Sequence, residues 1–137
     1  MKNDIELNKE NIIKYFETIE GFIKHNNMHL ESLVDNKAVM YADVSKDSMN
    51  AFNTVHGGLI FGLADTAMGV IAAASGKAVA TIDSNINYLK PCTGDKIKCI
   101  AEPIKVGNTI ALYKASIYNS KDELAAVITA NYIFLNK

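Results

Sequence analysis

The spacing of hydrophobic residues changes several times along the chain, and each change marks an expected element. Near the start, apolar residues recur at intervals of three and four, which predicts an amphipathic helix. These residues are Ile12, Phe16, Ile19 and Ile23. Gly21 weakens the last turn of this helix or marks its end. From residue 29 to residue 45 the apolar residues form two short runs separated by Asp35-Asn36-Lys37, which indicates a β-hairpin.

The segment from Gly57 to Ala74 is apolar throughout except at Asp65 and Thr66. A helix that is apolar on all sides is normally buried, so this segment is expected to be the core helix of the domain. A carboxylate inside such a helix is costly unless it is hydrogen bonded, paired or used chemically. Asp65 is therefore the first candidate for a functional residue.

Four strand-like runs follow the apolar helix, at residues 78–88, 96–106, 109–119 and 124–135, with short polar turns between them. In the first run apolar and polar residues alternate, which predicts a strand with one face of each kind. The two sets are Ala80, Ile82, Ile86 and Tyr88, and Thr81, Asp83, Asn85 and Asn87. Pro103 indicates an edge position or a bulge within its own strand.

The predicted order is one helix, two strands, the apolar helix and four more strands. Strands joined by tight turns form an antiparallel sheet, and a helix that is apolar all round needs a sheet curved around it. The sequence thus predicts an α+β fold in which a curved antiparallel sheet of five to six strands wraps one long central helix. We expect a single domain, in which an additional N-terminal helix within residues 1–26 packs on a body formed by residues 27–137.

Charge and cysteine content narrow the classes of partner and compartment. The formal net charge is −1 and the lysines are scattered, so nucleic acid is not an expected partner. The first residues carry charges where a signal peptide has an apolar core. Two cysteines, Cys92 and Cys99, are too few for a disulfide framework. We expect a cytoplasmic protein with reduced thiols.

The apolar segment 57–74 is also long enough to be weighed as a membrane span. Asp65 in its middle, its internal glycines and the lack of basic or aromatic anchors beside it argue against that interpretation. An interior helix without membrane insertion is expected instead.

Three glycines share one helical stripe with Asp65, because Gly58, Gly62 and Gly69 lie seven and three residues before it and four after it. Glycine within a helix costs about 1 kcal/mol relative to alanine, so this stripe needs a reason. One reason is close packing of another element, and the other is space for a ligand beside the carboxylate. Both can hold along different parts of the stripe.

The start of the apolar helix has chemistry of its own. The backbone N–H groups of a first helical turn lack partners within the helix, and the positive end of the helix dipole favours negative charge there. Such N–H groups can polarise a carbonyl and stabilise an oxyanion. His56, which directly precedes this turn, either holds the turn or contacts a substrate.

The residues Asn50, His56-Gly57-Gly58 and the run from Leu63 to Ala67 form the pattern N-x5-HGG-x4-LADTA. This pattern resembles that of the acyl-CoA thioesterases of the hotdog fold, specifically their PaaI-like branch, and the resemblance covers about residues 28–135. It implies an enzyme that hydrolyses acyl-CoA thioesters to free acid and CoA. Coenzyme A is then part of the substrate, and no separate cofactor or metal is implied.

The resemblance also implies roles for individual residues. Asp65 would be the catalytic carboxylate, which activates water or attacks the thioester carbonyl itself. Gly57 would offer its backbone N–H to the thioester oxygen, and Thr81 would orient the water, as a Ser or Thr at this place does in some members. The residues expected to line the site and place the thioester are Asn50, His56 and Gly58.

Helix geometry indicates that one chain does not complete this site alone. Eight residues separate Gly57 from Asp65, which corresponds to about 12 Å of helix rise. A carbonyl bound at Gly57 is therefore expected to meet the Asp65 of a second chain, which predicts a homodimer and leaves a dimer of dimers open. Two alternative functions remain open, namely a non-catalytic acyl-CoA binding or sensing domain and a hydratase of the same fold.

Overall fold

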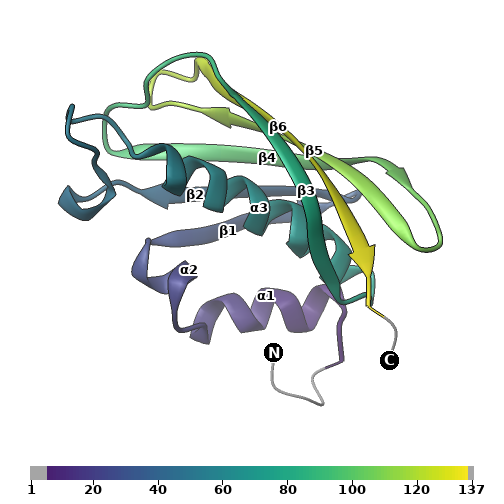
Figure 1. Ribbon diagram of the computed structural model, residues 1–137. Helices are drawn as coiled ribbons and strands as arrows, with labels where there is room; N and C mark the ends of the chain where they lie inside the picture. Colours follow the sequence, from purple (N-terminus) through teal and green to yellow (C-terminus); the bar gives the residue numbers. More distant parts are fainter. Residues whose placement is uncertain (1–5, 136–137) are drawn as a thin grey trace.

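The computed structural model describes residues 6–135, which form three α-helices and one sheet of six strands (Figure 1). The helices are α1 (Lys9–Thr18), α2 (Phe22–His25) and α3 (Gly57–Ala74), and a short 3-10 helix, η1, covers Lys46–Ser48. The strands are β1 (Met28–Val34), β2 (Lys37–Asp43), β3 (Val79–Tyr88), β4 (Lys96–Val106), β5 (Ile110–Tyr118) and β6 (Leu124–Phe134).

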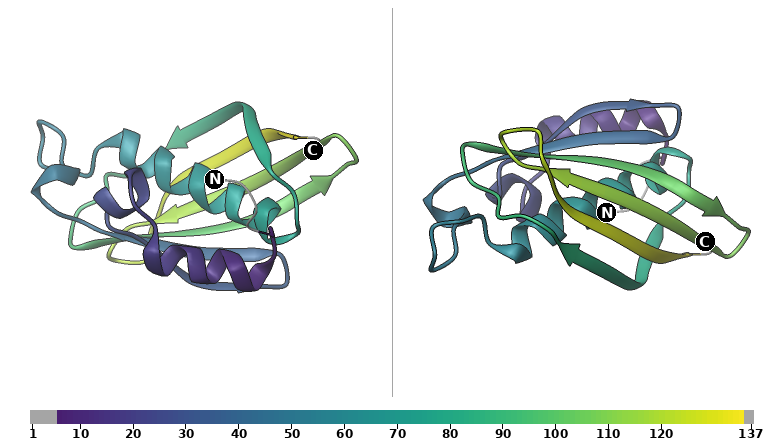
Figure 2. Two further views of the ribbon diagram at one scale, coloured as in Figure 1. Left: turned by 90° about the horizontal axis from the view of Figure 1, so that it is seen from below. Right: turned by 90° about the horizontal axis from the view of Figure 1, so that it is seen from above.

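The sheet is antiparallel throughout, in the order β1-β2-β4-β5-β6-β3. It curves around α3, which lies across its inner face, and α1 lies beside α3 and β1 (Figures 1 and 2). The predicted α+β fold, a curved antiparallel sheet around one long helix, is thereby confirmed. The bounds of the last four strands agree with the prediction to within one residue at each end.

Helix α3 supplies the centre of the core. Leu63, Ala64, Ala67 and Met68 are fully buried against inward-facing residues of the sheet such as Tyr113 and Ile128. By length and composition alone α3 would pass as a membrane span. Its burial inside the sheet accounts for the same composition, as expected for a core helix.

The N-terminal region differs from the single helix that the sequence pattern predicts. Helix α1 is capped by Asn8, whose side chain accepts a hydrogen bond from the Asn11 N–H, and it ends at Thr18. Ile19 is extended, and Gly21 has a φ of 88°, a left-handed conformation that favours glycine. The single predicted helix is thus divided, because α1 ends three residues before Gly21, and Gly21 is the N-cap of the separate helix α2. Residues 1–5 lie outside the described residues, and the division into residues 1–26 and 27–137 stays a prediction.

The predicted β-hairpin and the predicted bulge at Pro103 are both confirmed. The hairpin between β1 and β2 turns at Asp35 and Asn36, both of which have positive φ (53° and 59°), as a two-residue hairpin turn requires. The register of β4 against β5 shifts between Pro103 and Lys105, so the proline lies at a bulge.

Strand β3 corrects the predicted alternation of apolar and polar faces. Its register against β6 shifts between Thr81 and Asp83, so Ile82 is an extra residue, and its side chain is 49% exposed. A bulge of this kind reverses the facing of the residues beyond it. Thr81 therefore points toward α3, on the same side as Ile86 and Tyr88, although strict alternation had placed it on the opposite face.

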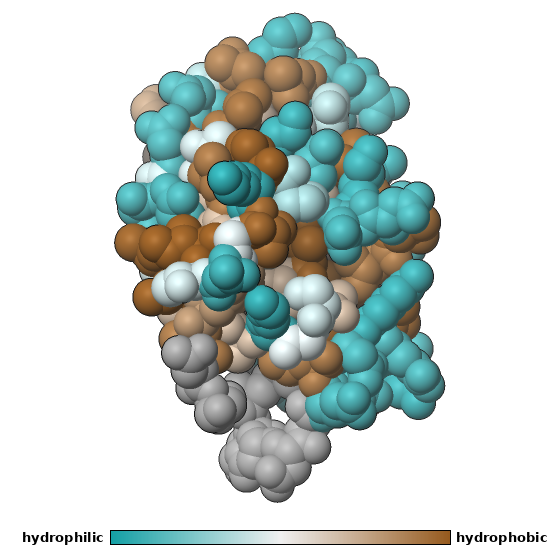
Figure 3. Space-filling view, turned by 90° about the vertical axis from the view of Figure 1, so that its right-hand side faces the viewer, coloured by the Kyte–Doolittle hydropathy of each residue, from teal (hydrophilic) through white to brown (hydrophobic). Residues whose placement is uncertain are grey.

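The outer surface near the β4–β5 turn carries apolar side chains among polar ones (Figure 3). Ile110 and Ile133 are paired in register on neighbouring strands, and both are exposed. The polar residues between such side chains keep this surface mixed in character.

Candidate active site

Asp65 lies midway along α3 and is half-buried. Its Oδ1 atom accepts two hydrogen bonds, from the Tyr132 hydroxyl at 2.6 Å and from the Thr81 hydroxyl at 2.9 Å. Within residues 6–135 no hydrogen bond reaches its second oxygen, Oδ2. One carboxylate oxygen is thus held in place, and the other is free to act on a bound molecule.

Tyr132 is a residue of this site that the sequence interpretation missed. It lies on β6, is 2% exposed, and shares its O–H between Asp65 Oδ1 and the Asp65 carbonyl oxygen, 3.0 Å away. Burial, followed by the adjacent Asp65 carboxylate, raises the pKa of Tyr132 well above its ordinary value of 10.0, so the hydroxyl stays a donor. The signal was available, because Tyr132 continues the inward-facing positions of Ile128 and Ala130, and a buried tyrosine hydroxyl needs a partner.

A second group of residues gathers at the start of α3. His56 is the N-cap, and its Nδ1 accepts a hydrogen bond of 2.8 Å from the Gly58 N–H. The Tyr88 hydroxyl donates to the carbonyl oxygen of Gly57 at 2.8 Å. Among the described residues no acceptor takes the Gly57 N–H, which remains available to a bound carbonyl.

Asn50 organises the loop that leads into α3. Its Oδ1 accepts hydrogen bonds from the N–H groups of Phe52 (2.8 Å) and Thr54 (3.2 Å), and its Nδ2 donates to the Thr54 hydroxyl (2.8 Å). The side chain predicted to line the site is thus engaged largely within its own loop. Its role toward a substrate stays a prediction.

These residues border an open groove with a volume of about 580 Å³. Its walls come from the loop before α3, the first turn of α3 and the segment that follows β3. The lining includes Asn50, His56, Gly57, Gly58, Tyr88 and Lys90. Cys92 adjoins the groove but is 1% exposed, and burial raises the pKa of its thiol to about 11.

The structure gathers the predicted site residues into two groups but does not unite them. Thr81 joins Asp65 near the middle of α3. The second group, at the start of α3, comprises Asn50, His56, Gly57 and Gly58. Because α3 is continuous from Gly57 to Ala74, the helix rise of about 12 Å between Gly57 and Asp65 separates the groups within one chain.

The glycine stripe of α3 shows close packing along one part and open space along another, the two explanations considered for it. A Cβ atom at Gly58 would lie 3.0 Å from the His56 ring, and one at Gly62 would lie 3.0 Å from the Phe22 ring. A Cβ atom at Gly69 would meet nothing within 4 Å. The stripe is therefore closely packed before Asp65 and open after it.

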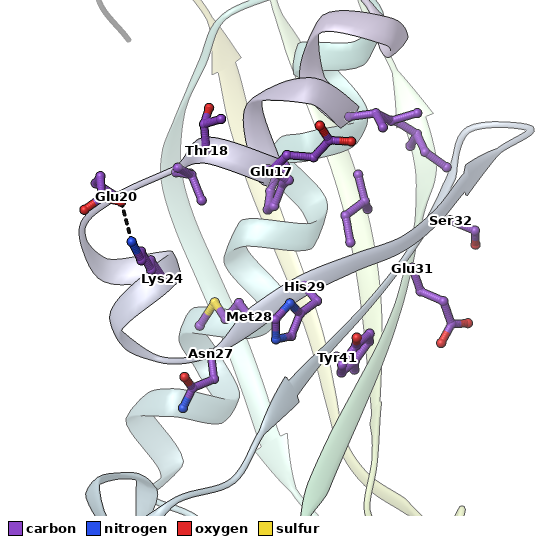
Figure 4. Close-up of a pocket in the computed structure, with 15 residues that line it drawn as sticks. Glu17, Thr18, Glu20, Lys24, Asn27, Met28, His29, Glu31, Ser32 and Tyr41 are labelled. Atoms are coloured by element: carbon purple, nitrogen blue, oxygen red, sulfur yellow. Dashed lines mark hydrogen bonds and ion pairs between the residues drawn. The ribbon is translucent and has the colours of Figure 1, made fainter.

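Another cavity, of about 740 Å³, lies between α1, α2 and β1, away from the predicted residues (Figure 4). Lys24 pairs there with Glu20 at 2.6 Å, and the His29 ring stacks on Tyr41 with 4.8 Å between centroids. Within residues 6–135 no group of three His, Cys, Asp or Glu side chains is placed to hold a metal ion.

Comparison with known proteins adds family evidence to this geometry. Residues 52–126, more than half of the chain, match the family model described as the thioesterase superfamily. A putative esterase of Archaeoglobus fulgidus is 34% identical over 95 residues, which cover 69% of this chain and 62% of that protein. The human acyl-coenzyme A thioesterase 13 is 30% identical over 93 residues, 66% of each chain. The chain spans 62%, 54% and 63% of the first three curated relatives that it matches.

Solved structures show the same fold. The PaaI protein of Escherichia coli superposes with a TM-score of 0.83 at 23% identity, over 90% of this chain and 89% of that one. A thioesterase protein of Streptococcus pneumoniae, solved with coenzyme A, gives a TM-score of 0.76 at 26% identity, over 81% and 88%. The chain therefore belongs to the thioesterase superfamily and has the hotdog fold of its PaaI-like members.

Proposed function

We propose that this protein hydrolyses acyl-CoA thioesters to the free acid and CoA, with Asp65 as general base or nucleophile. The observation that carries the proposal is the half-buried Asp65 carboxylate, whose Oδ1 is held by Tyr132 and Thr81 while Oδ2 has no partner among residues 6–135. A carboxylate fixed by one oxygen presents the other in a defined direction, as positioned acid–base groups and nucleophiles require.

The relatives support CoA thioesters as the substrate class. The human relative is named as an acyl-coenzyme A thioesterase, and the Streptococcus pneumoniae structure contains coenzyme A. Thioester chemistry also suits a sparse site. The carbonyl is electrophilic and the thiolate leaves without being protonated, so one base and one oxyanion donor suffice.

The start of α3 supplies that oxyanion donor in the proposal. The Gly57 N–H has no acceptor among the described residues and lies at the positive end of an 18-residue helix. A thioester oxygen that accepts this N–H is stabilised as negative charge develops on it. His56 and the Asn50 loop border the same groove and place the thioester.

A homodimer completes each site in this proposal. Gly57 and Asp65 lie about 12 Å apart along one helix, so Asp65 of one chain serves the groove of the other. Asp65 Oδ2 accepts no hydrogen bond among residues 6–135, so it is available to a thioester bound by the second chain. A dimer of dimers and the cytoplasm remain expectations, the latter supported by the free thiols of Cys92 and Cys99.

The first experiment tests Asp65. We expect Asp65→Asn to lower the rate of thiol release from acyl-CoA by at least about 100-fold, the usual contribution of a positioned base. Asp83→Asn is the matched control. Asp83 lies on the face of β3 opposite Thr81 and accepts a hydrogen bond from Asn131 of β6. Unaltered turnover by Asp65→Asn would remove Asp65 from the mechanism.

Thiol release, the melting temperature with acyl-CoA and the absorbance of an enoyl-CoA together separate the proposed hydrolase from the two alternatives. A binding or sensing domain would raise its melting temperature with acyl-CoA and cleave none of a panel of short, branched, long and aromatic acyl-CoAs. A hydratase would consume the conjugated absorbance of an enoyl-CoA. We expect neither result.

The second experiment isolates the Gly57 N–H. Proline is favoured at the first position of a helix and lacks the N–H, and His56, with φ −59° and ψ 133°, has the conformation that a residue before proline prefers. We expect Gly57→Pro to turn over about 100-fold more slowly than Gly57→Ala. The alanine variant keeps the N–H but displaces the Tyr88 ring in the same way, so equal rates would exclude this N–H as a donor.

The third experiment tests the shared site. Asp65→Asn and Gly57→Pro chains are unfolded, mixed in equal amounts and refolded together. If one site takes Asp65 from one chain and Gly57 from the other, half of the dimers regain one intact site, which restores about a quarter of the wild-type activity. If one chain carries a complete site, mixing restores nothing.

A further inference from the structure

One peptide group at the start of α3 joins two side chains. Tyr88 donates its hydroxyl hydrogen to the carbonyl oxygen of Gly57 at 2.8 Å. The N–H of the same peptide group belongs to Gly58 and donates to His56 Nδ1, also at 2.8 Å. Tyr88 and His56 are thus the two ends of one continuous hydrogen-bonded chain.

We propose that Tyr88 is a positioning residue that acts on the substrate through His56, an inference that rests on the proposed function. A donor on a carbonyl oxygen polarises the peptide group and strengthens the hydrogen bond that its N–H donates. Tyr88 therefore tightens the contact between the Gly58 N–H and the His56 ring.

This contact decides which nitrogen of His56 can donate. An Nδ1 atom that accepts a hydrogen bond carries no proton, so the proton of the neutral ring lies on Nε2. His56 is exposed and borders the groove, where Nε2–H is a donor to a thioester bound beside the Gly57 N–H. The chain of hydrogen bonds fixes both the orientation and the tautomer of this ring.

The packing around Gly57 fits this role for Tyr88. A Cβ atom at residue 57 would lie 3.0 Å from the Tyr88 hydroxyl oxygen and 3.1 Å from its Cζ atom, so the ring rests directly on the glycine. Although Tyr88 is 52% exposed, burial of its remainder raises the pKa of the hydroxyl, which keeps it a donor.

Strand β3 connects this contact to Asp65 of the same chain. The bulge at Ile82 turns Thr81 and Tyr88 to the same side, so one strand bonds to Asp65 and to the peptide group at the start of α3. One edge strand therefore holds both Asp65 and the start of α3 of its own chain, which in the proposed homodimer belong to two different sites.

Kinetics test the proposal with Tyr88→Phe, which keeps the ring and removes the hydroxyl. We expect kcat for acyl-CoA hydrolysis to fall about fivefold, the effect of one neutral hydrogen bond. Tyr118→Phe is the matched control, because Tyr118 lies on β5 away from the groove, and its turnover should equal that of the wild type. In a His56→Ala background, Tyr88→Phe should lower kcat less than about 1.5-fold, because the residue through which it acts is gone. A full fivefold loss in that background would overturn the proposal.

A spectroscopic readout decides the inference without relying on activity. In ¹⁵N-detected histidine spectra of the wild type, His56 should carry its proton on Nε2, with an Nδ1 signal shifted by an accepted hydrogen bond. Tyr88→Phe should move that Nδ1 signal toward the free value, and Tyr118→Phe should not. An unchanged signal in a folded Tyr88→Phe protein would refute the inference. A wild type that cleaves no acyl-CoA would refute only the proposed function.

Discussion

Replacing Tyr132 by phenylalanine removes one oxygen atom from the centre of the proposed site and leaves the buried ring in place. The lost hydroxyl is the 2.6 Å donor to Asp65 Oδ1, and a hydrogen bond to a charged group contributes about 1.5–3 kcal/mol to the free energy of unfolding. Asp65 is half-buried, so water replaces part of the contact. We therefore expect a loss of about 1.5–2 kcal/mol in urea denaturation at pH 7.

The same change should lower the catalytic rate. With only Thr81 left on Oδ1, the Asp65 carboxylate can rotate, and its free oxygen loses its fixed direction. We expect kcat for acyl-CoA cleavage, followed by thiol release, to fall about tenfold, which equals 1.4 kcal/mol of transition-state stabilisation.

Tyr113→Phe is the matched control. Tyr113 is 1% exposed and meets the Tyr132 ring edge to face, at 5.5 Å between centroids, but its hydroxyl makes no hydrogen bond within residues 6–135. Equal losses of stability in the two variants would show that ring packing, and not the contact with Asp65, explains the effect. In an Asp65→Asn background the cost of Tyr132→Phe should shrink to about 1 kcal/mol, the value of a neutral hydrogen bond.

Two further predictions concern the stability of the fold. Gly69→Ala should raise the free energy of unfolding by about 0.5–1 kcal/mol, and Gly62→Ala by less, because its Cβ would lie 3.0 Å from the Phe22 ring. The reverse order in urea denaturation would show that another chain or a ligand fills the space at Gly69. Burial raises the pKa of the Cys92 thiol to about 11 and that of the Cys99 thiol further. Both thiols therefore stay protonated in the folded chain at a pH where the thiols of the unfolded chain, with their ordinary pKa of 9.0, ionise. The free energy of unfolding should therefore fall as the pH rises above about 9, and Cys99→Ala should make this fall less steep. A urea midpoint that stays constant from pH 7 to about 10.5 would contradict this prediction.

The sequence predicted best where one pattern runs through a whole element. Helix α3 begins at Gly57 and ends at Ala74, the bounds of the apolar segment, because nearly every side chain there is apolar. The hairpin turn at Asp35 and Asn36 was equally predictable, since these residue types accept positive φ.

The sequence predicted least where one residue changes the geometry of many. The bulge at Ile82 has no local signal, yet it moves Thr81 to the face of Tyr88 and makes its contact with Asp65 possible. Gly21 is a sequence signal for the break after α1. The helical spacing of apolar residues continues past this glycine, however, and so it predicted one continuous helix.

Some residues of the candidate site were predictable from the sequence, and others were not. Asp65 stood out because a carboxylate inside an apolar helix is costly. Tyr132 is as close to the proposed chemistry, but its partner lies far away in the sequence, and only the placement of β6 over α3 brings the two together. Asn50 shows the opposite case, since its position was predicted and its engagement with the Thr54 hydroxyl was not.

Strand β3 follows α3 directly in the chain, yet it joins the sheet beside β6, the last strand to be synthesised. Val79 pairs with Phe134 and Tyr88 with Ala126, so β3 has no neighbour in the sheet until the C-terminal strand has left the ribosome. Asp65 and Thr81 are therefore made early and meet late, once β6 has been made and has paired with β3. A nascent chain that stops before β6 contains almost every residue of the proposed site but cannot assemble it.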